Sequence, residues 1–174
     1  MGESIKSRFK PSYPEKYMGD ANNIICRSSW ERVFCNWCDK RENVLRWASE
    51  EIAIPYVSPL DGRVHRYYPD FLIEIRDTDG KVKKQLIEIK PSKQTKRPET
   101  PKRVTKSFIY EATQYEKNMA KWKAATEFCL DNGIEFKIIT ETELGIKQHG
   151  RGNTRTGTRR GQNTRRRTRR LPKK

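Results

Sequence analysis

Residues 64–90 read VHRYYPDFLIEIRDTDGKVKKQLIEIK, and this stretch decides the fold that the sequence predicts. Apolar residues are frequent and partly alternate with polar ones over 64–75 and again over 83–90, as in half-buried strands. The sequence DTDG at 77–80 separates the two segments and is rich in turn-forming residues. The stretch therefore predicts two antiparallel strands joined by a tight turn.

Two carboxylates and a lysine stand near the ends of these strands. Side chains two apart in a strand share a face, so Glu88 and Lys90 point the same way while Ile89 points to the opposite layer. On the preceding strand, Asp70 lies on the face opposite to Phe71. If the strands pair through the turn, Asp70 and Glu88 can lie on one face near one end, and the register decides this.

The chemistry of such a pair favours a metal site. Two carboxylates held close together repel each other unless a cation lies between them, and carboxylate oxygens suit Mg²⁺ or Mn²⁺. An adjacent ammonium such as Lys90 could orient or deprotonate a water and stabilise charge on a phosphate. The same spacing also fits an exposed Glu–Lys ion pair without any catalytic role.

The elements around this stretch complete a mixed α/β order. Apolar residues at helical spacing predict a helix over 28–40, with Ser28 or Ser29 as its N-cap. Glu31 then falls in the first turn, where a carboxylate also suits the helix dipole. Further elements are expected as a strand at 51–57, a polar loop at 91–103, a long helix at 104–130 and a strand at 134–139. The order is helix, three strands, helix, strand, which places one sheet between helices.

The charge divides the chain into parts. The 174 residues carry a net charge of +16, and residues 147–174 hold 12 Lys and Arg with no Asp or Glu. This segment contains almost no apolar residue, so it cannot offset its ordering entropy and is expected to be disordered when alone. The sequence therefore predicts a leader at 1–23, one domain at 24–146 and a basic tail at 147–174.

A field this positive attracts polyanions, either nucleic acid or an anionic membrane. No run of about 18 apolar residues exists and the first residues lack the apolar stretch of a signal peptide, so the protein is expected in the cytosol. The four cysteines are then expected to be reduced, and CxxC at Cys35 and Cys38 lacks the further ligands of a zinc site.

Basic residues near the third strand and in the tail are the candidate DNA contacts. The tail has no aromatic residue, so it is expected to bind by charge without reading sequence. On the long helix, one stripe holds Gln114, Lys117 or Asn118, and Lys121, and it faces either the DNA or the solvent. The solvated interpretation is preferred for Gln114. The predicted contacts are Lys93, Lys96, Arg97, Lys121, Arg155, Arg159, Arg160, Arg165, Arg166 and Arg167.

Pro69-Asp70 and Glu88-Ile89-Lys90 resemble the signature of the PD-(D/E)xK nuclease superfamily, whose αβββαβ core matches the order read over about 24–140. The resemblance implies a restriction-endonuclease-like fold with a mixed central sheet flanked by helices. It also implies that Asp70 and Glu88 bind the metal and that Lys90 is the catalytic lysine. Glu31 would be the acidic residue that many members place on the first helix.

Three segments, RSSWERVFCNWCD, WASEEIAIPY and YYPDFLIEI, resemble the head completion nucleases of T4-like tailed phages. This resemblance implies a Mg²⁺- or Mn²⁺-dependent DNA endonuclease that acts during maturation of the virion head before tail joining. It would be found in the virion and in the host cytoplasm, with phage head and neck proteins as further partners. Two alternatives stay open: a non-catalytic plug that only holds DNA, and a restriction- or transposase-type endonuclease.

Overall fold

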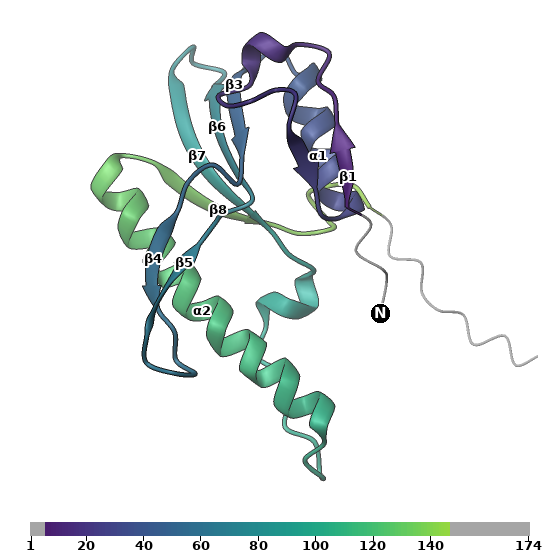
Figure 1. Ribbon diagram of the computed structural model, residues 1–174, viewed down its shortest axis with the longest axis vertical. Helices are drawn as coiled ribbons and strands as arrows, with labels where there is room; N and C mark the ends of the chain where they lie inside the picture. The colour runs from purple at the N-terminus through teal and green to yellow at the C-terminus, as the bar shows by residue number, and fades with distance from the viewer. Residues whose placement is uncertain (1–5, 147–174) are drawn as a thin grey trace, which may run out of the picture.

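The computed structural model describes residues 6–146 and has a mixed central sheet with a helix on either side (Figure 1). The strand order is β3-β6-β7-β8, in which the first three strands are antiparallel and β8 runs parallel to β7. The mixed α/β prediction with a restriction-endonuclease-like core is thereby confirmed. The strands of the sheet are β3 (Val44–Ser49), β6 (Phe71–Arg76), β7 (Val82–Ile89) and β8 (Glu135–Ile139).

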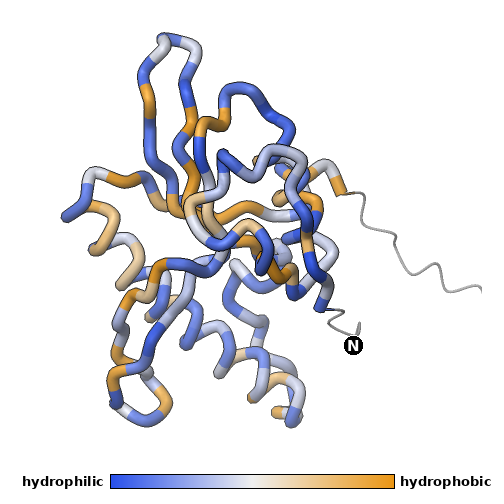
Figure 2. The backbone as a smooth tube through the Cα atoms, turned by 45° about the horizontal axis from the view of Figure 1, so that its top comes forward, coloured by the Kyte–Doolittle hydropathy of each residue, from blue (hydrophilic) through white to orange (hydrophobic). Residues whose placement is uncertain are grey.

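The two faces of this sheet bury different sets of side chains. One face packs with helix α1 (Ser29–Lys40) in a cluster that includes Trp47, Phe71 and Ile87. The other face packs with helix α2 (Lys106–Asn132) in a cluster that includes Leu86. Figure 2 shows the hydrophobic residues gathered on the central strands, with hydrophilic ones at the turns. Alternate residues of β7 thus enter opposite layers, as the period of a strand requires.

The helices begin and end where their capping residues lie. The Ser28 side chain accepts a hydrogen bond from the Glu31 amide at 3.1 Å, so the predicted helix at 28–40 is confirmed. Helix α2 begins after the N-cap Thr105 and ends at Gly133, whose φ of 65° is the left-handed conformation that glycine adopts easily. No helix within residues 6–146 has both the length and the apolar content needed to span a membrane.

The strands before β6 differ from the prediction. The expected single strand at 64–75 is interrupted at Pro69, which has no amide hydrogen to continue a ladder, so the chain leaves one sheet and enters another. Strands β4 (Ile54–Val57) and β5 (Val64–Tyr67) form a separate hairpin beside α2. The first strand of the central sheet is instead β3.

The described part of the predicted leader packs against the domain. Strand β1 (Ser7–Phe9) pairs with β2 (Ile24–Cys26), and Tyr17 packs edge-on against Trp47 at 4.8 Å between ring centroids. The short 3-10 turn η1 (Pro14–Lys16) ends on a lysine whose ammonium donates to three carbonyls at the C-terminal end of α1. Residues 6–23 therefore contribute to the core. The predicted tail at 147–174 lies outside the described residues.

Candidate active site

The register of β6 and β7 brings the two predicted carboxylates together. Phe71 pairs with Ile87, so Asp70, which directly precedes β6, stands at the level of Glu88 on the neighbouring strand. The amide of Ile89 donates a hydrogen bond of 2.6 Å to Oδ2 of Asp70, which holds that carboxylate against β7. Both carboxylates lie on the α2 side of the sheet, because Ile87 and Ile89 enter the opposite layer.

Glu88 is buried and both of its oxygens are engaged. Its side chain is 4% exposed, Oε2 accepts a hydrogen bond of 2.6 Å from the Tyr67 hydroxyl, and Oε1 lies 2.9 Å from the Lys90 ammonium. Lys90 keeps 26% of its side chain exposed. The Glu88–Lys90 pair is therefore a partly buried ion pair beside Asp70, with its carboxylate buried, rather than the exposed strand pair that the spacing alone allowed.

Burial and neighbouring charges shift the pKa values of Asp70 and Lys90. Burial, followed by the charge of Glu88, raises the pKa of Asp70 to about 7, although Lys90 opposes the shift. Burial alone would lower the pKa of Lys90, but Glu88 and Asp70 outweigh burial and raise it above its ordinary value. Lys90 is thus a cation at neutral pH, which favours a role in stabilising charge over a role as base.

This arrangement fits a hard divalent cation. Burial first and the charge of Glu88 second raise the pKa of Asp70, a bound cation would offset both effects, and no hydrogen bond reaches Oδ1 of Asp70 within residues 6–146. The described part of the chain holds no group of three or more His, Cys, Asp or Glu placed to bind a metal. The protein would supply two carboxylates, Asp70 and Glu88, which is typical of Mg²⁺ sites that leave other positions to water and phosphate.

Glu31, the predicted fourth residue, serves the N-terminus of α1. Its Oε2 accepts a hydrogen bond of 2.6 Å from the Arg27 amide, and Oε1 accepts one of 2.8 Å from the Ser28 hydroxyl. Its charge nevertheless contributes to the raised pKa of both Asp70 and Lys90. Glu31 is near enough to act on the site electrostatically, and its catalytic role stays a prediction.

Lys121 reaches the site from α2. Its ammonium lies over the rings of Tyr67 and Tyr56, at 5.3 and 5.9 Å from the centroids. Burial lowers the pKa of Lys121, while the charges of Glu88 and Asp70 act in the opposite sense. Tyr67 therefore contacts both Glu88 and Lys121, and sequence reasoning missed it because a tyrosine in a strand carries no chemical signature.

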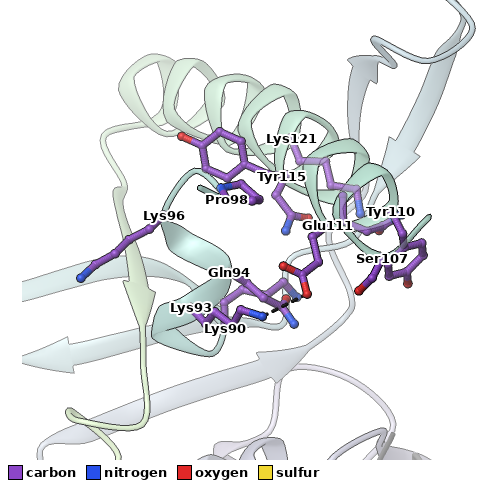
Figure 3. Close-up of a pocket in the computed structure, with 12 residues that line it drawn as sticks. Lys90, Lys93, Gln94, Lys96, Pro98, Ser107, Tyr110, Glu111, Tyr115 and Lys121 are labelled. Atoms are coloured by element: carbon purple, nitrogen blue, oxygen red, sulfur yellow. Dashed lines mark hydrogen bonds and ion pairs between the residues drawn. The ribbon is translucent and has the colours of Figure 1, made fainter. Parts of the chain in front are cut away.

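A cleft of about 470 Å³ opens beside Lys90, between α2 and the 3-10 turn η2 (Ser92–Thr95) (Figure 3). Lys93 and Lys96, two predicted DNA contacts, line it, and Lys93 forms an ion pair of 3.0 Å with Glu111. Arg97 directly follows the cleft residue Lys96 in the sequence, and its side chain is exposed. Gln114 is half-buried and also lines this open cleft, so its stripe of α2 faces η2, and its solvated interpretation stays a prediction. The predicted tail contacts lie outside the described residues.

The pKa of Asp70 leads to a prediction on stability. The carboxyl has a pKa of about 7 in the folded chain and an ordinary one near 4 when unfolded, so the folded state binds the proton more tightly. Between these values the free energy of unfolding of the metal-free protein is expected to fall as the pH rises, by on the order of 2–4 kcal/mol. Urea unfolding in EDTA from about pH 5 to pH 8 measures this slope. Asp70→Asn should flatten it, and an equal slope in both proteins would contradict the assignment.

The hydrogen bond from Tyr67 to Glu88 gives a second prediction. Tyr67→Phe removes one of the two described donors to a buried carboxylate, and the free energy of unfolding is expected to fall by about 2 kcal/mol. Tyr56→Phe is the matched control, because Tyr56 is buried beside Lys121 but donates no described hydrogen bond to a carboxylate. Urea unfolding compares the two variants, and equal losses would exclude a special role for the Tyr67 hydroxyl.

Comparison with known proteins adds independent findings. Residues 41–141 match the family described as the TnsA-like endonuclease N-terminal domain, a segment that includes Asp70, Glu88 and Lys90. The chain is also 38% identical over 145 residues to the protein named head completion nuclease of Enterobacteria phage T4. That match covers 81% of this chain and 94% of the phage protein.

Proposed function

Because this chain belongs to the family of the TnsA-like endonuclease N-terminal domain, we propose that it is a DNA endonuclease that depends on Mg²⁺ or Mn²⁺. The observation that carries the proposal is the pairing of half-buried Asp70 with buried Glu88, whose Oε1 contacts Lys90 at the wall of a lysine-lined cleft. A module that only bound DNA would gain nothing from two carboxylates beside such a cleft, because carboxylates repel phosphates.

Each residue of the site has a role in this proposal. Asp70 and Glu88 hold the metal, which when bound neutralises phosphate charge and lowers the pKa of water. Lys90 orients the attacking water and stabilises the charge that develops on the phosphate, as its raised pKa favours. Tyr67 holds Glu88 in place. The remaining assignments are Glu31 as an acidic residue acting on the site, and Lys93, Lys96, Arg97 and Lys121 as contacts to the DNA backbone.

The similarity to a phage head completion nuclease indicates at which stage, and where, the protein would cleave DNA. We propose that the protein acts on DNA during maturation of a phage head, before tail joining, in the host cytoplasm and in the virion. Head and neck proteins are the expected protein partners. The alternative of a non-catalytic plug predicts DNA binding without cleavage, and a restriction- or transposase-type enzyme predicts cleavage at defined sequences.

A cleavage assay with plasmid DNA distinguishes the endonuclease, the plug and the sequence-specific enzyme. The full chain is incubated with supercoiled plasmid in Mg²⁺, in Mn²⁺ and in EDTA, beside the variants Asp70→Ala and Lys90→Ala. Cleavage at many positions by the wild type alone, abolished by EDTA, is the expected result. Binding without cleavage under every condition would favour the plug, and discrete fragments would favour a sequence-specific enzyme.

The basic tail leads to a third prediction. Deleting residues 147–174 removes 12 Lys and Arg, and the logarithm of DNA affinity is expected to fall less steeply with the logarithm of salt concentration, by several units of slope. Fluorescence anisotropy with labelled DNA at several salt concentrations measures the slope. A truncated protein with an unchanged slope would mean that the tail releases no counterions on binding.

A further inference from the structure

The cleft beside the proposed site combines features that phosphate binding alone does not explain. Positive side chains line it, with one carboxylate, Glu111, among them. Amide, aromatic and proline side chains make up much of the remaining wall, and Figure 3 shows side chains of η2 and α2 facing one another across it. The lining lysines are Lys90, Lys93, Lys96 and Lys121.

Two amide side chains on α2 have no hydrogen-bond partner among the described residues. Asn118 is 9% exposed and lines the cleft, and no hydrogen bond to its side chain is formed within residues 6–146. Gln114 lies one turn earlier on the same face and likewise has no described partner. Neither amide is among the buried side-chain polar atoms of residues 6–146 that lack a partner, so both reach the open space of the cleft, where a ligand can take the place of water. These amides therefore point to a ligand that brings its own donors and acceptors.

Aromatic and proline side chains form separate apolar parts of the wall. Tyr110 and Tyr115 come from α2, and Pro98 comes from the segment after η2. Tyr110 is 64% exposed, although it is large and partly apolar. Aromatic rings of this kind stack on nucleobases without regard to sequence. A ligand with a planar ring, polar edges and a negative charge would match the amides, the tyrosines and the lysines together.

We propose that this cleft binds one unpaired nucleotide of the DNA, next to the phosphate that is cut; the inference rests on the proposed nuclease function. A base within a duplex has its faces covered by neighbours and its pairing edge occupied, whereas an unpaired base offers both to the protein. The volume of about 470 Å³ lies in the range of sites for small ligands and cannot admit a duplex.

The cleft lies next to the residues proposed to cleave DNA. Lys90 and Lys121 line the cleft, and each is close to Glu88: Lys90 lies 2.9 Å from it, and Lys121 lies over the ring of Tyr67, which donates to it, so a nucleotide bound in the cleft would have a phosphate next to the proposed metal site. Lys93 and Lys96 then lie beside phosphates further along the strand. The preferred substrate class is DNA with unpaired nucleotides, such as frayed ends, gaps or flaps.

Binding without cleavage tests this inference. The full chain carrying Asp70→Asn, in EDTA, is titrated against labelled duplexes that end blunt, in a one-nucleotide overhang, or in the same overhang without its base. Overhangs of either polarity are used. The overhang with a base is expected to bind about tenfold more tightly than the abasic one, since the amides and rings contact the base. Equal affinity for the two would overturn the inference, because charge alone would then explain binding.

Variants in the cleft test whether the cleft is responsible for the preference for an overhang that carries a base. In the Asp70→Asn protein, a further Asn118→Leu or Gln114→Leu substitution is expected to remove most of the tenfold difference in affinity between the overhang with a base and the abasic one. The control Asn36→Leu, at a helical asparagine on α1, should keep this difference. Both amides are tested because Gln114 is less buried than Asn118, so its substitution disturbs the fold less. A difference that survives both cleft variants would place the base elsewhere and overturn the inference.

The inference and the proposed function fail in different ways. A base preference that depends on the cleft, found together with absence of cleavage by the wild type, would overturn the nuclease proposal and with it the claim that the nucleotide flanks a cut phosphate. Cleavage by the wild type without any base preference would overturn the inference alone.

Discussion

Asp70→Asn is expected to lower the rate of DNA cleavage by at least about a thousandfold while the protein stays folded. Asparagine has the same size and can still accept the Ile89 amide, so the backbone contact that holds residue 70 against β7 is kept. What is lost is one of two carboxylate charges in the proposed metal site. The same change removes a group whose pKa is raised to about 7, so the metal-free variant should be more stable than the wild type at neutral pH.

Plasmid cleavage and calorimetric titration with Mn²⁺ measure the two parts of this result. Asp77→Asn is the matched control, because Asp77 follows β6 at its other end and forms an ion pair with Lys83 instead. The control should cleave DNA and bind Mn²⁺ like the wild type. An Asp70→Asn protein that is stable, cleaves normally and binds Mn²⁺ normally would remove Asp70 from the site.

Lys90→Met is expected to lower the cleavage rate by about 10²- to 10³-fold, the usual cost of removing one group that stabilises developing charge. Methionine keeps the length of the apolar stem and removes only the ammonium, which lies 2.9 Å from Glu88. Metal binding is expected to persist, because both carboxylates remain. This separation of cleavage from metal binding distinguishes Lys90 from Asp70.

A lysine on the same strand provides the control for Lys90. Lys84 lies on β7 and forms an ion pair with Glu74, away from the cleft, so Lys84→Met should cleave DNA at the wild-type rate. Single-turnover cleavage in Mg²⁺ compares the two variants, and thermal unfolding checks that Lys90→Met, which leaves Glu88 with one fewer partner, is folded. Equal cleavage by both variants would assign Lys90 a structural role.

The segment 64–90 shows which features of the site were readable from the sequence. The turn at 77–80 and the alternation of β7 predict the strand pair, and together they place Glu88 and Lys90 opposite to Ile87 and Ile89. The register that sets Asp70 beside Glu88 depends on packing between distant residues, so it could only be stated as a condition. The structure supplies that register.

Strand β3 shows why another part of the fold was missed. Its pairing with β6 shifts register between Val44 and Arg46, so the regular alternation that reveals a strand is broken. Asn118 could be placed on a stripe of the long helix, but the sequence left open whether that stripe faces DNA or solvent, because the segment packed against it was not known. Only the position of η2 turns that face of α2 into the wall of a cleft.

The pairing of β6 with β7 has a consequence for the fidelity of folding. A slip of one residue between these strands would carry Glu88 and Lys90 into the α1 layer and turn Ile87 and Ile89 toward α2. Two charges would then enter an apolar core, which costs several kcal/mol per ion. Misregistered chains are therefore unstable, and in them Asp70 and Glu88 do not lie side by side. A metal that needs both carboxylates would therefore bind only to chains folded in the native register.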